Sequence, residues 1–237
     1  MLKARNFFTA IYQATIFTPD TSEFSTSKFL ATILGKYADR YDGMVQALPI
    51  PDDIPPEFPR VILQSKDGLF KLEASPARVN SFFIENIELQ AEIDDVSNKC
   101  VEVLEYYVQE TKAQVDRLAM ILTRVHKSEY PAQILIDKFC KHELRNTLFE
   151  GSENFEIHNH KQVQLKDFTV NSWVRCKTAT LLFANGSLPG IIVEQDLNTL
   201  AFKIEQRRFN NKDIRSYFSL ALQEAQDVLI TYFPDDD

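Results

Sequence analysis

The sequence predicts an α+β fold of two similar halves, in which a largely antiparallel sheet packs with amphipathic helices. Residues 1–116 and residues 117–237 both follow the order strand, helix, strands, helix. Apolar residues alternate in some segments, which indicates strands, and recur at helical spacing in others, which indicates helices. Hydrophobic residues make up 44% of the 237 residues, enough for a substantial core. We expect the halves to form one compact unit.

The first half opens with a predicted strand over residues 10–17. The serines and threonine at 25–27 offer oxygens to the free amides of a helix start, and this helix is expected to end near Gly43. Residues 50–59 contain four prolines, which cannot donate to a central strand, so they form a surface connector. Residues 60–73 predict a hairpin that turns at Asp67-Gly68.

The first half closes with a further strand and a long amphipathic helix. An apolar run begins at Phe82, Phe83 and Ile84 and continues toward Ile93. Ser97 is expected to cap the helix, whose apolar stripe continues to Val115.

The second half starts with a buried strand over residues 118–125 and a helix that runs from Pro131 to Leu144. The apolar period then changes to two, which predicts a hairpin between Phe155 and Leu165 with its turn at residues 158–161. A long strand over residues 169–183 follows.

A turn at residues 185–187 leads to two more strands, at 191–197 and 200–204, and Asn211 is expected to cap the last helix. Short elements of this kind also recur by chance, so the repeated order does not require a duplication. If the halves are duplicated, their sheets either join edge to edge or curl around the helices. Either arrangement would give a continuous antiparallel surface whose open face is the expected binding surface.

Six apolar positions on the predicted stripes and strands are expected to form the core, so that truncating any one to alanine lowers stability. They are Leu104, Val108, Leu122, Phe139, Leu222 and Leu229.

The chain lacks the common sequence signatures of catalysis and cofactor binding. Its six glycines are scattered, so no glycine-rich loop is available to hold a phosphate, and no cofactor is expected. Cys100, Cys140 and Cys176 are far apart, which indicates a reducing compartment rather than a disulfide framework. No catalytic residue is identified. With no signal peptide or membrane-length apolar run, we expect a cytoplasmic protein.

His158 and His160 are the weak candidates for a metal site. On a strand, residues two apart share a face, so both imidazoles would reach one ion if Glu156 or another carboxylate joined them. We favour the alternative that His158-Asn159-His160 forms a hairpin turn, because asparagine suits turns and two ligands do not complete a site.

The charge balance favours a protein partner. Lysine and arginine number 26 and aspartate and glutamate 34, so the net charge is -8 and the average surface repels nucleic acids and acidic membranes. Candidate partner-binding residues are acidic positions on the second predicted helix and three aromatic positions, for which core packing is the alternative: Glu102, Glu105, Glu110, Phe82, Phe83 and Trp173.

Segments of both halves resemble a sporadically distributed family of uncharacterised bacterial two-half α+β proteins. The similar segments are residues 61–70 (VILQSKDGLF), 75–82 (SPARVNSF), 192–198 (IVEQDLN) and the helix at 220–233. The resemblance implies a bacterial intracellular protein and supplies no catalytic residues.

The leading hypothesis is a non-enzymatic bacterial interaction or accessory subunit, with an immunity or defence role as one form of it. Its oligomeric state is unknown, and a homodimer is compatible with the sequence. The alternative is a small-ligand-binding α+β domain with an apolar pocket between sheet and helices, lined by phenylalanines. A metal enzyme built on His158, His160 and a carboxylate is the third hypothesis.

Overall fold

The computed structural model describes residues 2–19, 24–49, 51, 54–85, 91–183, 186–201 and 208–235. In these parts of the chain, nine strands form one sheet in the order β2-β3-β4-β5-β1-β6-β9-β8-β7, and each neighbouring pair is antiparallel. The α+β prediction is therefore confirmed. The strands are β1 (Phe8–Phe17), β2 (Val45–Ala47), β3 (Val61–Gln64), β4 (Phe70–Ala74), β5 (Arg78–Ile84), β6 (Arg117–Lys127), β7 (Glu156–Leu165), β8 (Phe168–Phe183) and β9 (Gly186–Thr199).

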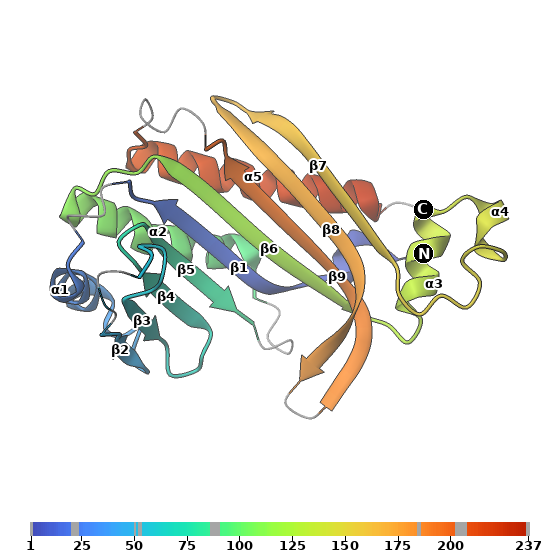
Figure 1. Cartoon of the computed structure of the whole chain (residues 1–237), viewed down its shortest axis with the longest axis horizontal. Helices are drawn as coiled ribbons and strands as arrows, with labels where there is room; N and C mark the ends of the chain where they lie inside the picture. Colours follow the sequence, from blue (N-terminus) through green and yellow to red (C-terminus); the bar gives the residue numbers. More distant parts are fainter. Residues whose placement is uncertain are drawn as a thin grey trace.

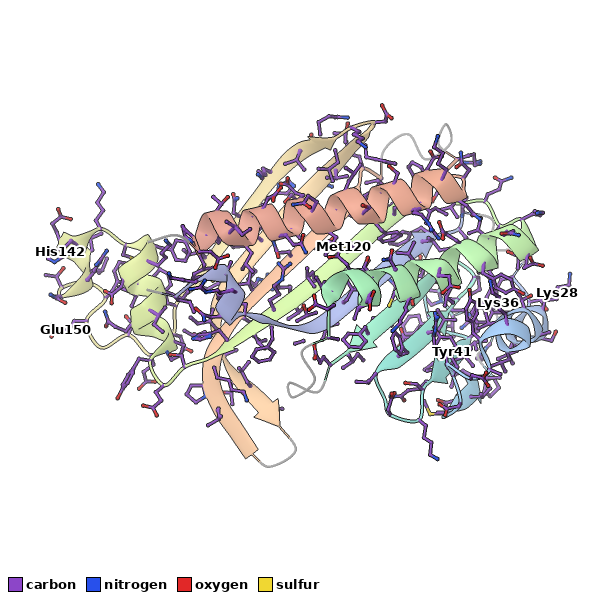
Figure 2. The ribbon with its side chains drawn as sticks, turned by 180° about the vertical axis from the view of Figure 1, so that it is seen from behind. Lys28, Lys36, Tyr41, Met120, His142 and Glu150 are labelled. Atoms are coloured by element: carbon purple, nitrogen blue, oxygen red, sulfur yellow. The ribbon has the colours of Figure 1, made fainter. Side chains whose placement is uncertain are left out.

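Two long helices cover one face of this sheet and contact each other (Figure 2). They are α2 and α5, each of which ends one half of the chain. The described helical segments are η1 (Ala4–Asn6), α1 (Thr26–Tyr37), α2 (Ile93–Thr111), α3 (Pro131–Phe139), α4 (His142–Arg145) and α5 (Asn211–Tyr232). None of them combines the length and the apolar character that a membrane crossing requires.

The two halves meet where β1 pairs with β6 at the middle of the sheet. This pairing places Tyr12 opposite Leu122, and both are fully buried beneath the helices. Tyr12, Leu104 and Phe218 belong to one core cluster, although they come from β1, α2 and α5. The first α+β half and the second therefore share a hydrophobic core.

Five of the six predicted core residues are buried, because the apolar stripes of α2 and α5 face the sheet and Leu122 lies on the face of β6 that they cover. Phe139 is the exception and is only partly buried. Its ring meets Tyr232 and Phe233 edge-on at the end of the molecule, with ring centroids 5.6 and 6.0 Å away. It therefore packs at the margin of a small second cluster rather than in the main core.

The predicted turn at residues 158–161 is wrong. Residues 156–165 form the continuous strand β7, and the chain turns at Lys166 and Asp167, where Lys166 has a φ of 50°. Polar residues occupy both faces of β7 because it is the outermost strand of the sheet, where side chains remain in contact with water.

Two predicted helix caps shift by a few residues. α2 starts at Ile93, so Ser97 lies inside the helix, where its buried hydroxyl is 2.8 Å from that of Tyr12. α5 is capped by Asn210, whose side chain accepts a hydrogen bond from the Asp213 amide. The predicted strand at 191–197 is part of β9, whereas most of the one at 200–204 lies outside the described residues.

Candidate binding surface on the open face of the sheet

The face of the sheet opposite α2 and α5, here called the open face, has no described helix over it (Figure 1). Side chains on β1 show how it is formed. Tyr12 and Ala14 are buried on the helical side, whereas Ile11 and Gln13 alternate with them and are more exposed. Strand register then places one row of side chains across six strands. The row consists of Phe82, Gln13, Ile121, Asp196, Trp173 and His160.

Trp173 is the largest side chain of this row in the second half, and 37% of its surface is exposed. The His160 ring stacks on it, with centroids 3.8 Å apart and an interplanar angle of 17°. His158, two residues along β7, lies 5.2 Å from the same ring system. Both imidazoles therefore support the indole from one side and leave part of it open to solvent.

Arg175 follows Trp173 on the same face of β8. Its guanidinium lies 2.8 Å from Glu156 on β7 and 3.8 Å from Glu194 on β9. Arg175 and Glu194 join Trp173, His158 and Asp196 around a hollow of about 210 Å³. The hollow therefore has an aromatic wall and charges of both signs.

A chain of hydrogen bonds holds the polar side chains beside the hollow. Asn198 donates to Asp196 at 3.0 Å and accepts from Arg117 at 3.1 Å and from Asn171 at 3.2 Å. The Asn171 amide oxygen in turn lies 3.3 Å from His160 Nε2. Because each bond crosses or follows a strand, the network fixes these side chains on a rigid support.

Burial raises the pKa of Asp196 above its usual value, and the repulsion from Glu194 adds to this effect. The hydrogen bond from Asn198 and the charge of Arg117 act in the opposite direction. The carboxyl group is thus partly removed from water at the base of the open face.

The first half contributes a more apolar part of the open face. Ile11 and Ile84 lie directly opposite each other on β1 and β5, and both are exposed. Phe82 lies beside them on β5, with the Lys71 ammonium 5.7 Å from its ring centroid. Lys71 also pairs with Glu73 at 2.5 Å. Its charge is therefore balanced within the surface.

The predicted aromatic candidates divide between the two faces. Phe82 and Trp173 lie on the open face, but Phe83 is buried on the helical side and contacts Phe70. Adjacent residues of a strand point to opposite faces, so only one of the two phenylalanines can reach the open face. Phe83 is thus wrong as an exposed partner-binding residue.

The acidic candidates all lie on α2, away from the open face. Glu105 is buried and its carboxylate binds Arg215 of α5 through two hydrogen bonds, one of 2.8 Å. It joins two helices and is not available to a partner. Glu102 is half-buried and lies 3.2 Å from Arg40, whereas Glu110 is exposed near the helix end.

The arrangement does not favour a metal centre at His158 and His160. The histidines share a face of β7, but both pack against the indole of Trp173. No cluster of three or more histidine, cysteine, aspartate or glutamate side chains with metal-binding geometry occurs in the described ranges. Cys100 and Cys176 are buried, and burial raises the pKa of each thiol to about 12, which disfavours the reactive thiolate.

Sequence reasoning missed the network residues Arg117, Asn171, Asp196 and Asn198. A signal was present for Asp196 and Asn198, because polar residues occupy the alternate positions 194, 196 and 198 of β9. Such alternation indicates a solvated face, but it does not indicate which polar side chains meet across neighbouring strands.

Neither a family model nor a curated protein matches the chain. Among solved structures, it is similar to the di-domain ARO/CYC proteins BexL, from the BE-7585A biosynthetic pathway, and StfQ, from the steffimycin biosynthetic pathway. Each is 11% identical and aligns over 94% of this chain and 96% of its own, with TM-scores of 0.21 and 0.20. Likeness at this level carries no argument about function. The resemblance to a bacterial family therefore stays a prediction.

Proposed function

We propose that this protein is a non-enzymatic binding protein, an interaction or accessory subunit, that holds a partner protein against the open face of its sheet. The observation that carries the proposal is Trp173, a half-exposed indole supported by His160 on a face that no described helix covers. Tryptophan and arginine are the residues most enriched among those that dominate binding energy in protein interfaces. An immunity or defence role stays a prediction from the sequence.

The rigidity of the surface supports this function. Binding costs less when the contacting side chains are already held in place. Asn198 and Asn171 are fixed by hydrogen bonds beside Trp173, and Arg175 is held between two carboxylates. The side chains around Trp173 are thus held in position before a partner binds.

The charge pattern favours a protein over a nucleic acid. Protein surfaces that bind nucleic acids offer lysine and arginine side chains that neutralise the phosphates. On the open face, Arg175 lies near Glu156 and Glu194, and Lys71 is paired with Glu73. These two cations are already paired with carboxylates, so the surface around Trp173 and Phe82 suits a partner of mixed polarity.

The first experiment locates the partner-binding face. A photocrosslinking amino acid replaces Gln162, which is exposed on β7 in register with Asn171, or Ser219, which is exposed on α5. Crosslinking in the source organism is expected to capture a protein from position 162 and not from position 219. Capture from position 219 alone would place the interface on the helical side and contradict the proposal.

The second experiment measures affinity for the captured protein after purification. Trp173→Ala is expected to weaken binding by about 30-fold or more, the effect of losing a dominant interface residue. Tyr130→Ala is the matched control, because Tyr130 is 71% exposed before α3 and does not belong to the sheet. Equal affinities for Trp173→Ala and the parent, with both folded, would rule out Trp173 as the anchor.

A further inference from the structure

A cleft of about 450 Å³ lies on the helical side of the sheet, away from the open face. Its walls come from η1, the start of β1, the amino end of α2 and the carboxyl-terminal half of α5. In Figure 2, η1 lies beside the carboxyl-terminal end of α5, which it contacts, and α2 begins farther along the same face. The sequence also suggested a small-ligand-binding domain with an apolar pocket lined by phenylalanines. This cleft differs from such a pocket, because charged and amide side chains accompany Phe7 and Phe8 in its walls.

Arg124 of β6 lines this cleft as a buried charge that no described carboxylate balances. It is 5% exposed, and its Nη1 donates to Gln195 at 2.6 Å and to the Ala225 carbonyl at 3.2 Å. No carboxylate of the described residues lies within 4 Å of its guanidinium. Burial lowers its pKa to about 10, so it remains charged at neutral pH. Such a charge is costly unless an anion approaches it.

Glu85 lines the same cleft and carries the opposite charge. It is 7% exposed, and its Oε1 accepts a hydrogen bond from the Ala91 amide at 2.9 Å. Its Oε2 is buried and finds no hydrogen-bond donor within the described part of the chain. Glu92 and Asp235 also line the cleft. Apart from Arg124 and Arg5, its charged wall residues are therefore carboxylates.

We propose that this cleft binds a small zwitterion of the amino-acid class, with its carboxylate at Arg124 and its ammonium group toward Glu85 and Glu92. A simple anion would balance Arg124 but meet the carboxylates, and a simple cation would leave Arg124 without a counterion. The volume falls within the range of small-molecule sites. Asn6 and Gln226 add polar side chains to the walls.

The test is isothermal titration calorimetry of the purified full chain with each of the twenty amino acids as probes. At least one is expected to bind saturably. Its amide, which lacks the carboxylate, and its N-acetyl form, which lacks the ammonium group, are each expected to bind at least about tenfold more weakly. No saturable binding by any amino acid to folded protein would overturn the proposal. Equal binding by the N-acetyl form would also overturn it, because the site would then take simple anions.

Two variants connect the binding to these residues. Arg124→Gln removes the buried charge and is expected to weaken binding at least about tenfold. Glu92→Gln tests the acidic side at an exposed position where the fold is not at risk, and weaker binding is again expected. Glu110→Gln, at an exposed position near the other end of α2, is the matched control and leaves affinity unchanged. Unaltered binding by folded Arg124→Gln or by Glu92→Gln would contradict the assigned arrangement.

Discussion

At the residue scale, neighbouring side chains take opposite roles because a strand alternates its faces. Phe83 packs under the helices, whereas Phe82 lies on the open face. The same rule makes Val174 a core residue between the surface residues Trp173 and Arg175. A shift of the strand register by one residue would turn the core side chains to the open face and the open-face side chains to the core. Burying one set of alternate residues therefore also determines which residues form the open face.

Leu104 tests the core at this scale. It is fully buried on α2, and Leu104→Ala is expected to lower the free energy of unfolding by about 2 to 5 kcal/mol through lost contacts and a cavity. Leu182→Ala is the control, because Leu182 is 79% exposed on β8, and it is expected to change stability by less than about 0.5 kcal/mol. Urea denaturation measures both values. A Leu104→Ala curve that coincides with the parent's would mean that this face of α2 is not in the core.

At the scale of elements, local chemistry determines where the helices begin. α5 starts with a capping box, in which the Asn210 side chain accepts from the Asp213 amide at 3.1 Å and the Asp213 carboxylate accepts from the Asn210 amide at 3.0 Å. Ser25 caps α1 in a similar way through the Lys28 amide. Without a side-chain acceptor, these backbone amides would have no hydrogen-bond acceptor within the helix.

The cap of α5 leads to a direct prediction. Asn210→Ala removes the acceptor for the Asp213 amide and is expected to cost about 1 kcal/mol of stability, whereas Asn210→Ser keeps an acceptor and most of that stability. Guanidinium denaturation of the two variants and the parent measures the difference. Equal midpoints for the alanine and serine variants would show that the cap contributes nothing measurable.

At the scale of the whole molecule, the β1–β6 pairing unites the two halves. It joins strands from residues 1–116 and 117–237 in the middle of one sheet, and Glu105 of α2 binds Arg215 of α5 across the helical layer. Separating the halves would expose two long strand edges and part of the common core. The halves therefore resemble each other in order but depend on each other for burial.

This dependence predicts a single cooperative unfolding transition. Differential scanning calorimetry is expected to record one endotherm whose calorimetric and van't Hoff enthalpies agree, because both halves contribute to one core. Two resolved transitions, each removable by mutation in one half, would show that the halves fold independently.

The sequence by itself determined the types of element and the faces of most of them. Apolar spacing predicted the buried stripes through Leu104 and Leu222, a run of apolar residues predicted the buried strand at 118–125, and the period of two that begins at Phe155 led to the strand at 169–183. These features follow from local geometry, since the periods of a helix and a strand are visible within a few residues. At His158-Asn159-His160, turn-forming composition competed with strand alternation, and pairing with β8 decided for the strand.

Only the tertiary structure decided which distant residues meet. Arg117 reaches Asn198 over 81 positions of sequence, and Trp173 acquires its support from His160 through the pairing of β7 with β8. Arg124 likewise becomes a buried wall of a cleft only when α5 lies over β6. Strand order and register depend on burying both halves together, which no local pattern specifies. The open face and the cleft are therefore properties of the assembled sheet.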